Sequence, residues 1–176
     1  MKIRINEELY LSGYKAGDKD ALVRHLNDNE IRRNLLMVPS PYFEEDAEVW
    51  IRQVAGMPLN SQFLIRKGDG EAIGGIGFVF PAQEVMRHQA DVGYWLAKGW
   101  RGKGFMKQVL LRFCEHGFEY FKLIRISAHI FSTNIHSEQL LLSCGFRQEG
   151  YLEKFYMKNG KLIDAKLFSK LKTLSQ

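Results

Sequence analysis

The sequence predicts a mixed α/β domain with about seven strands. Three observations indicate this fold class. Short apolar runs are typical of strands, other segments carry apolar residues at helical spacing, and the two kinds of segment interleave in the order β-α-α-β-β-β-α-β-α-β-β. Because 45% of the 176 residues are hydrophobic, the chain has enough apolar material for a core, and a wholly disordered chain is excluded.

The first third of the chain is predicted to be a strand followed by helices. Residues 9–14 form the strand, and Asp18 is placed to cap a helix whose apolar residues lie at positions 21–26. A second helical turn covers residues 30–36. Residues 44–55 form a further helix, since acidic residues occupy its first turn, where the helix dipole favours negative charge.

The middle of the chain changes to β-type patterning. Runs over residues 62–67, 72–80 and 89–96 predict three antiparallel strands, and Gly68-Asp69-Gly70 is a strong hairpin turn between the first two. From residue 102 to 121, apolar side chains recur on one face, which predicts a long amphipathic helix.

The last third alternates between the two element types. Residues 123–131 are predicted to be a strand and residues 134–144 a shorter helix. Gly145 marks the end of that helix, because glycine readily adopts the left-handed conformation found there. Two strands, over residues 146–157 and 161–170, close the chain.

We expect one domain over residues 1–176, with its core at about residues 9–171, because no linker or repeat is visible. No run of about 18 apolar residues is present, and charge interrupts the N-terminus where a signal peptide has its apolar run. Cys114 and Cys144 are too few for a disulfide scaffold and lack the neighbours of a zinc site. These features predict a soluble cytoplasmic protein with reduced thiols, no membrane association and no metal.

The charge balance favours an anionic partner. The chain has 25 Lys and Arg residues against 20 Asp and Glu residues, a formal net charge of +5. Acidic residues are interleaved with the basic ones, and no dense basic run suggests nucleic-acid binding. A phosphorylated small molecule explains the charge equally well.

The most informative segment is the glycine turn between the predicted strand that ends near Leu96 and the long helix. Glycines at the start of a helix let backbone N–H groups approach a phosphate, and Arg101 and Lys103 add positive charge. The spacing of Gly102 and Gly104 fits neither a P-loop nor a dinucleotide-binding fingerprint. A tight strand-to-helix connection without a ligand is the alternative interpretation.

Two motifs carry a resemblance to a known family. Arg101-Gly102-Lys103-Gly104-Phe105-Met106 resembles the pyrophosphate loop Gln/Arg-x-x-Gly-x-Gly/Ala of the GNAT superfamily of N-acetyltransferases, with methionine in place of the last small residue. Asn134-x-x-Ser137, followed by Cys144-Gly145-Phe146 and Glu149-Gly150-Tyr151, is similar to the Rim-type ribosomal-protein N-terminal acetyltransferases. The likeness covers about residues 9–171.

The resemblance implies the GNAT fold, a mostly antiparallel sheet flanked by helices, and acetyl-coenzyme A (acetyl-CoA) as co-substrate. It also implies that the strand before the glycine turn splays from its neighbour to admit the pantetheine arm, and that a backbone N–H within residues 95–98 donates to the thioester oxygen. On this basis coenzyme binding is assigned to Leu96, Ala97, Lys98, Arg101, Gly102, Lys103, Gly104, Phe105, Met106 and Asn134.

The resemblance also suggests two catalytic residues. Ser137 matches the position whose hydroxyl serves the departing thiolate, and Asp91 matches a strand position at which several members carry a glutamate base. Each has a structural alternative. Asn134 and Ser137 suit the first turn of a helix, and Asp91 suits the edge of a strand as an ion-pair partner. His129, on a central strand, is interpreted as an interior histidine.

The function that the resemblance implies is transfer of an acetyl group from acetyl-CoA to a primary amine, by direct attack in a ternary complex. By likeness to the Rim-type branch, the preferred acceptor is a protein or peptide α-amino group. A small amine, such as a polyamine, amino acid or antibiotic, is the alternative acceptor, and a non-catalytic acyl-CoA sensor is the alternative function. We expect no nucleic-acid partner, and a homodimer is compatible with this fold.

Overall fold

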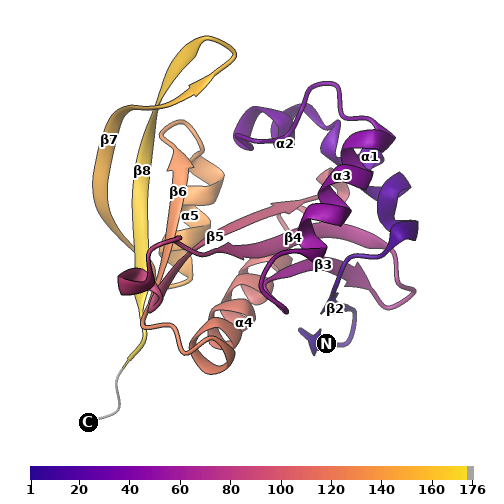
Figure 1. Cartoon of the computed structure of the whole chain (residues 1–176), viewed down its shortest axis with the longest axis horizontal. Helices are drawn as coiled ribbons and strands as arrows, with labels where there is room; N and C mark the ends of the chain where they lie inside the picture. Colours follow the sequence, from indigo (N-terminus) through magenta and orange to yellow (C-terminus); the bar gives the residue numbers. More distant parts are fainter. Residues whose placement is uncertain (174–176) are drawn as a thin grey trace. The chain divides into compact units, whose positions relative to one another are not determined.

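A computed structural model describes residues 1–173 as an α/β protein with an eight-stranded sheet (Figure 1). The strand order is β1-β2-β3-β4-β5-β6-β8-β7. The strands are β1 (Lys2–Arg4), β2 (Leu9–Ser12), β3 (Gln62–Lys67), β4 (Ala72–Val79), β5 (Gln89–Leu96), β6 (Arg125–Phe131), β7 (Arg147–Lys158) and β8 (Lys161–Leu171).

Five α-helices and three short 3₁₀ turns connect these strands within the described residues. They are η1 (Ala16–Asp18), α1 (Lys19–Leu26), α2 (Asn29–Asn34), α3 (Glu44–Ala55), η2 (Glu84–Met86), η3 (Lys98–Trp100), α4 (Phe105–Tyr120) and α5 (Ile135–Ser143). The bounds of α3, β3 and β5 coincide with the predicted ones. The predicted order is confirmed from β3 onward, whereas β1 is additional and three helices precede β3 where the predicted order had two.

The sheet is mixed and mostly antiparallel, as predicted. Antiparallel registers join β1 to β2, β2 to β3, β3 to β4, β6 to β8 and β7 to β8, whereas β5 and β6 run parallel. The strand that the sequence did not predict, β1, is three residues long, and Ile3 is its one buried residue. Such a segment is too short to show a period-2 pattern.

The chain divides into two compact units. The first contains Met1–Gly77 and Tyr94–Val109, and the second contains Phe78–Gly93 and the chain from Leu110 onward. Strands β4 and β5 and helix α4 each contribute residues to both units.

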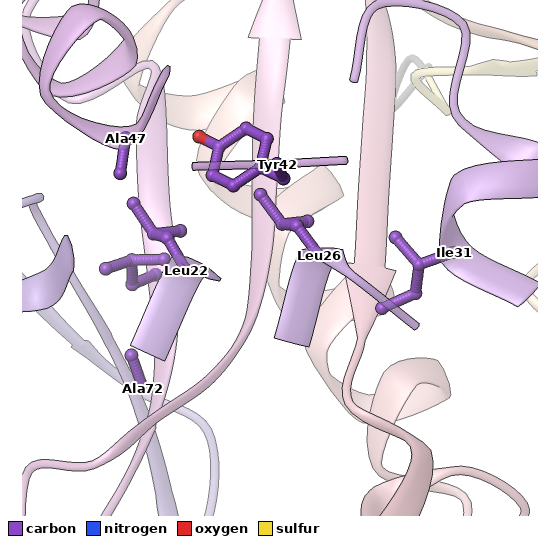
Figure 2. Close-up of a cluster of buried hydrophobic side chains, with 7 residues drawn as sticks. Leu22, Leu26, Ile31, Tyr42, Ala47 and Ala72 are labelled. Carbon is purple, nitrogen blue, oxygen red and sulfur yellow. The ribbon is translucent and has the colours of Figure 1, made fainter. Parts of the chain in front are cut away.

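A hydrophobic cluster forms the core of the first unit beneath α1, α2 and α3. Figure 2 shows Leu22 and Leu26, which lie four residues apart on one face of α1, next to the ring of Tyr42. Trp50 of α3 and Trp95 of β5 pack against the cluster from its margin. The buried members are Leu22, Leu26, Ile31, Tyr42, Ala47, Leu64 and Ala72.

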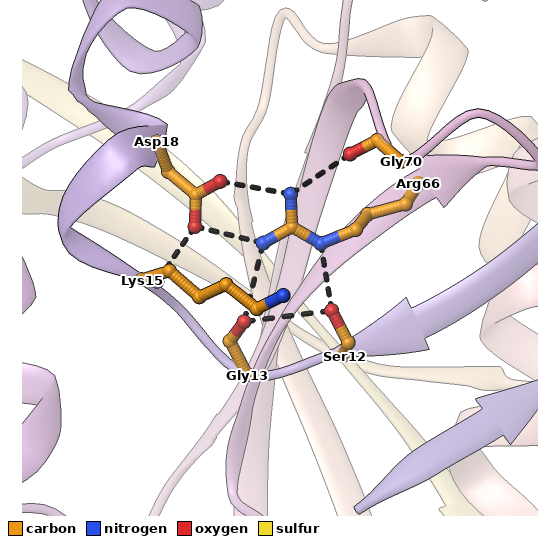
Figure 3. Close-up of polar contacts among 6 residues, drawn as sticks. All are labelled: Ser12, Gly13, Lys15, Asp18, Arg66 and Gly70. Carbon is orange, nitrogen blue, oxygen red and sulfur yellow. Dashed lines mark hydrogen bonds and ion pairs between the residues drawn. The ribbon is translucent and has the colours of Figure 1, made fainter.

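The first unit also contains a buried ion pair (Figure 3). The guanidinium of Arg66 on β3 donates to both carboxylate oxygens of Asp18. The second oxygen of Asp18 also accepts from the backbone N–H of Lys15, at 2.6 Å. Asp18 makes no side-chain cap to α1, so the predicted capping role is wrong. Its carboxylate instead neutralises a buried cation.

In the second unit, α4 supplies a buried face. Val109 and Leu110 mark the boundary between the units, and Phe113 on the next turn is fully buried. The ring of Phe113 stacks on Phe78, with 4.2 Å between ring centres. A Cβ added to Gly117 would lie 2.7 Å from the Phe78 ring, so this glycine permits the close approach of helix and ring. The predicted amphipathic helix is confirmed.

Candidate functional site

The glycine turn lies in the first unit, between the end of β5 and the start of α4. Gly102 and Gly104 have φ angles of +74° and +77°, in the left-handed region that favours glycine. A Cβ at either position would meet no atom within 4 Å. Backbone conformation, and not lack of space, is therefore the reason that the turn requires glycine at these two positions.

The first turn of α4 can bind an anion. Phe105 and Met106 begin this 16-residue helix, whose first turn has no acidic residue. The unpaired N–H groups and positive dipole end of such a turn favour phosphate. Lys103 is exposed, and its ammonium lies 5.4 Å from the centre of the Trp100 ring. The glycine turn thus combines open backbone, helix N-terminus and positive charge.

The Arg101 side chain is engaged by three neighbours within the first unit. Its Nε donates to the carbonyl oxygen of Leu96 at 2.8 Å, and its two terminal nitrogens donate to Glu30 and Asp28, both at 2.6 Å. The guanidinium is 23% exposed and is neutralised by these two carboxylates. The side chain therefore joins the turn to α2, and contact of Arg101 with the coenzyme stays a prediction.

Asp28 completes this connection at the start of α2. Its side chain accepts from the backbone N–H of Ile31 at 3.1 Å and so caps the helix. Burial would raise the pKa of the Asp28 carboxyl, but the hydrogen bonds from Arg101 and Ile31 outweigh burial and hold the pKa below its usual value. The carboxylate is thus ionised at neutral pH, as the pairing with Arg101 requires.

One backbone N–H at the end of β5 is engaged within the fold. The N–H of Ala97 donates to the carbonyl oxygen of Ile73 at 2.8 Å. This N–H is engaged within the fold, so the predicted donor to a thioester oxygen is restricted to the other amides of residues 95–98. Lys98 begins the 3₁₀ turn that follows and is exposed.

Pairing between β5 and β6 is short. The parallel register runs from Gln89↔Arg125 to Asp91↔Ser127, although β5 continues to Leu96 and β6 to Phe131. The register between these two strands thus ends at Asp91 and Ser127. The splay that the resemblance implies stays a prediction.

Asn134 and Ser137 lie at the start of α5 in the second unit. The side-chain oxygen of Asn134 accepts from the backbone N–H of Ser137 at 3.1 Å, which makes Asn134 the helix cap. Ser137 is 8% exposed. The capping role that the sequence left open is thus observed, and it leaves the side-chain NH₂ group of Asn134 outside the cap.

Asp91, also in the second unit, has a partner that the sequence did not predict. A carboxylate oxygen of Asp91 lies 3.3 Å from Nδ1 of His129 on β6. The imidazole stacks on the ring of Phe155, with 5.5 Å between ring centres and 5° between planes. The sequence carries no local signal for this contact, because the three residues lie on three different strands.

The predicted site residues fall into two groups. Residues 96–98 and 101–106 belong to the first unit, whereas Asp91, Asn134 and Ser137 belong to the second. Among residues 1–173, no group of three or more His, Cys, Asp or Glu side chains is arranged to hold a metal ion. No helix in the described part of the chain is long and apolar enough to cross a membrane.

Known proteins resemble the chain over almost its whole length. A family model described as the Acetyltransferase (GNAT) domain matches residues 8–147. An uncharacterized N-acetyltransferase, p20 of Bacillus licheniformis, is 31% identical over 98% of this chain and 97% of its own. A ribosomal-protein-serine acetyltransferase of Escherichia coli is 31% identical over 74% of this chain and 75% of its own.

A solved structure has the same fold. Spermidine N-acetyltransferase from Vibrio cholerae, in complex with CoA and spermine, superimposes with a TM-score of 0.77. The match covers 94% of this chain and 96% of that chain, at 22% sequence identity.

Proposed function

This chain belongs to the GNAT family and is an acetyl-CoA-dependent N-acetyltransferase, and from this premise we propose that its preferred acceptor is a protein or peptide N-terminal α-amino group. We further propose that it acts as a single-domain cytoplasmic enzyme. The likeness to the ribosomal-protein-serine acetyltransferase supports the acceptor. The transfer is a direct attack of the amine on the thioester within a ternary complex.

The observation that carries the coenzyme site is the pair of left-handed glycines before α4. Gly102 and Gly104 leave the amides of the first helical turn open to a pyrophosphate, and Lys103 supplies positive charge. In this proposal Arg101 holds the turn in place through Leu96 and Asp28 and does not touch the phosphates. The residues proposed to contact the coenzyme are Leu96, Lys98, Gly102, Lys103, Gly104, Phe105, Met106 and Asn134.

Three residues of the second unit are proposed to serve the reaction: Ser137 and Asp91 act on protons, and Asn134 holds the coenzyme. Ser137 lies in the first turn of α5, and its hydroxyl hydrogen-bonds the thiolate as the C–S bond breaks. Asn134 caps the same turn through its oxygen, so its NH₂ group is proposed to hold the pantetheine arm. Asp91 contributes to deprotonation of the acceptor amine. It is the last residue of β5 in the register with β6.

A panel of acceptors tests the proposed function. Calorimetry with acetyl-CoA establishes binding, and thiol release is then measured with peptides that have free N-termini, their Nα-blocked counterparts, spermidine and free amino acids. We expect release with free N-termini and none with the blocked peptides. Faster release with spermidine or an amino acid would overturn the acceptor assignment, and binding without acetylation of any amine would indicate an acyl-CoA sensor.

A polyamine acceptor is the second candidate. The likeness to the spermidine N-acetyltransferase bound to CoA and spermine favours it. The formal net charge of +5 disfavours a polycationic acceptor, because like charges repel at long range. The acceptor panel separates the two candidates directly.

A further inference from the structure

We propose that His129 is the group that takes the proton from the acceptor's ammonium, and that Asp91 is the positioning residue that orients its imidazole. The proposal rests on the proposed function, in which an amine attacks the thioester. It changes the role of Asp91 from a base that acts on the amine to a support for the base. Both residues belong to the second compact unit, and the structure gives the distance between their side chains.

The contact between the two side chains selects one form of the imidazole. Nδ1 of His129 lies 3.3 Å from a carboxylate oxygen of Asp91. A carboxylate accepts hydrogen bonds and cannot donate them when ionised, so it favours the tautomer with the proton on Nδ1. Nε2 then carries the lone pair. A histidine held in this way is prepared to accept a proton at Nε2 and to be stabilised as imidazolium by its neighbour.

Stacking fixes the ring as well. The imidazole lies parallel to the Phe155 ring, and the Tyr156 ring packs edge-on against Phe155 with 4.7 Å between ring centres. The His129 side chain is 22% exposed and that of Asp91 is 48% exposed. The pair is therefore held firmly but is open to a substrate from solvent, unlike a histidine enclosed in a core.

The electrostatic surroundings of His129 suit a base that becomes positively charged. Arg125 lies four residues before His129 on β6, and its charge is neutralised by Glu149. Burial and then the charge of Asp91 raise the pKa of Tyr156, so this hydroxyl stays protonated at neutral pH. The charged group in contact with the imidazole is Asp91 of β5, which also interacts electrostatically with Arg125 of β6 and Tyr156 of β7. The register partner of His129 on β8, Leu167, is uncharged.

Asp91 and His129 lie close together along the paired strands β5 and β6. Asp91 and Ser127 form the last register pair of β5 and β6, and His129 lies two residues farther along β6. Because residues two apart on a strand share a face, Ser127 and His129 face the same side. His129 therefore lies two residues beyond the last register pair of β5 and β6, on a part of β6 that stays paired with β8.

The proton balance is complete with these groups. Nε2 of His129 takes one proton from the R–NH₃⁺ acceptor, and the neutral amine then attacks the thioester carbonyl, forming the C–N bond. As the C–S bond breaks, the second amine proton passes through the Ser137 hydroxyl to the thiolate. The imidazolium releases its proton to solvent. The products are the amide, CoA–SH and one proton.

The pH dependence of kcat/KM tests the assignment. The assay uses whichever amine the acceptor panel identifies, so a wrong acceptor class does not affect it. For the wild type we expect kcat/KM to fall on the acidic side of the profile, because Nε2 that already carries a proton cannot accept one from the acceptor. We expect His129→Gln to lower kcat/KM at neutral pH by about 100-fold. In this variant kcat/KM should still fall toward acidic pH, and this acid limb of the profile should lie at higher pH than in the wild type. It should then coincide with the pH at which the acceptor amine itself loses its proton.

Asp91→Asn provides an independent readout and leaves the imidazole in place. The amide oxygen of asparagine still accepts from Nδ1, but the negative charge beside the imidazolium is gone. The acid limb should therefore move to lower pH, with unchanged affinity for acetyl-CoA. An unchanged limb in this variant would contradict the positioning role.

The control is His88→Gln, an exposed histidine of the same unit whose loss should leave the pH profile unchanged. Circular dichroism and acetyl-CoA calorimetry on each variant report folding and coenzyme binding separately from proton transfer. If His129→Gln keeps the wild-type acid limb, His129 is a packing residue and the proposal is wrong.

Discussion

The guanidinium of Arg66 donates to the two carboxylate oxygens of Asp18 at 2.8 and 2.7 Å, and less than a tenth of either side chain is exposed. The other donated bonds reach Ser12 Oγ and the carbonyl oxygens of Gly13 and Gly70. All five N–H donors of Arg66 are therefore satisfied. One side chain thus joins the end of β2, the turn η1 and the hairpin after β3.

Breaking this pair should destabilise the protein strongly. Asp18→Asn leaves a buried guanidinium without a counter-charge, and loss of one partner of a buried pair costs about 3–5 kcal/mol. Urea denaturation measures the loss. Glu44→Gln, which removes an exposed partner of Lys19, is the matched control and should have a much smaller effect. Equal losses in the two variants would show that the Arg66 pair contributes no more than a surface pair.

Gly104→Val should abolish acetyl-CoA binding and preserve the fold. At φ +77° a β-branched residue is strongly disfavoured, so the turn must change conformation, whereas the exposed position lets the rest of the protein stay folded. Calorimetry measures binding, and circular dichroism reports folding. Gly99→Ala, at a glycine of the same connection without a positive φ, should bind normally. Normal affinity in Gly104→Val would exclude this turn as the pyrophosphate site.

The role of Arg101 can be separated from that of a phosphate ligand. Arg101→Met removes the support of the turn and should weaken acetyl-CoA binding about tenfold. The double variant Asp28→Asn/Glu30→Gln frees the guanidinium and loosens the turn, so it should also weaken binding. Tighter binding in the double variant would instead mean that the released cation reaches the phosphates. Calorimetry at low ionic strength measures all three proteins.

Ser137→Ala should slow the chemical step and leave coenzyme affinity nearly unchanged. A hydroxyl that serves the departing thiolate acts only as the C–S bond breaks, and its loss should lower the single-turnover rate about 100-fold. Ser143→Ala, at the other end of α5, is the control. Equal losses of rate and affinity in Ser137→Ala would point to a binding role for this serine.

Glu149 should contribute to stability at neutral pH and cease to do so in acid. Hydrogen bonds from Arg125 and Ser169 lower the pKa of its carboxyl to about 2. A lowered folded-state pKa means that the stabilisation is present above the ordinary pKa of glutamate and is lost as pH falls toward 2. Glu149→Gln should therefore reduce the dependence of unfolding free energy on pH in this range. Urea denaturation at several pH values, with Glu153→Gln as control, tests this.

Local patterns were sufficient for most secondary structure. The helix α3 and the strands β3 and β5 have the predicted bounds, because apolar periodicity and helix-end chemistry are properties of neighbouring residues. The glycine turn was also evident, since the left-handed backbone conformation favours glycine. Asn134 was expected as a possible cap for the same reason, and it caps α5.

By itself the sequence determined the fold class, most of the order of elements and the place of the glycine turn. Only the tertiary structure decided the partners of the charged side chains. Arg66 meets Asp18 across 48 residues, and Arg101 meets Asp28 across 73, so each arginine is neutralised by a carboxylate that spacing does not indicate. His129 meets Asp91 in the same way. The physical reason is that charge pairing depends on distance in space, which strand order and register create, whereas helices, strands and turns depend on the residues next to one another.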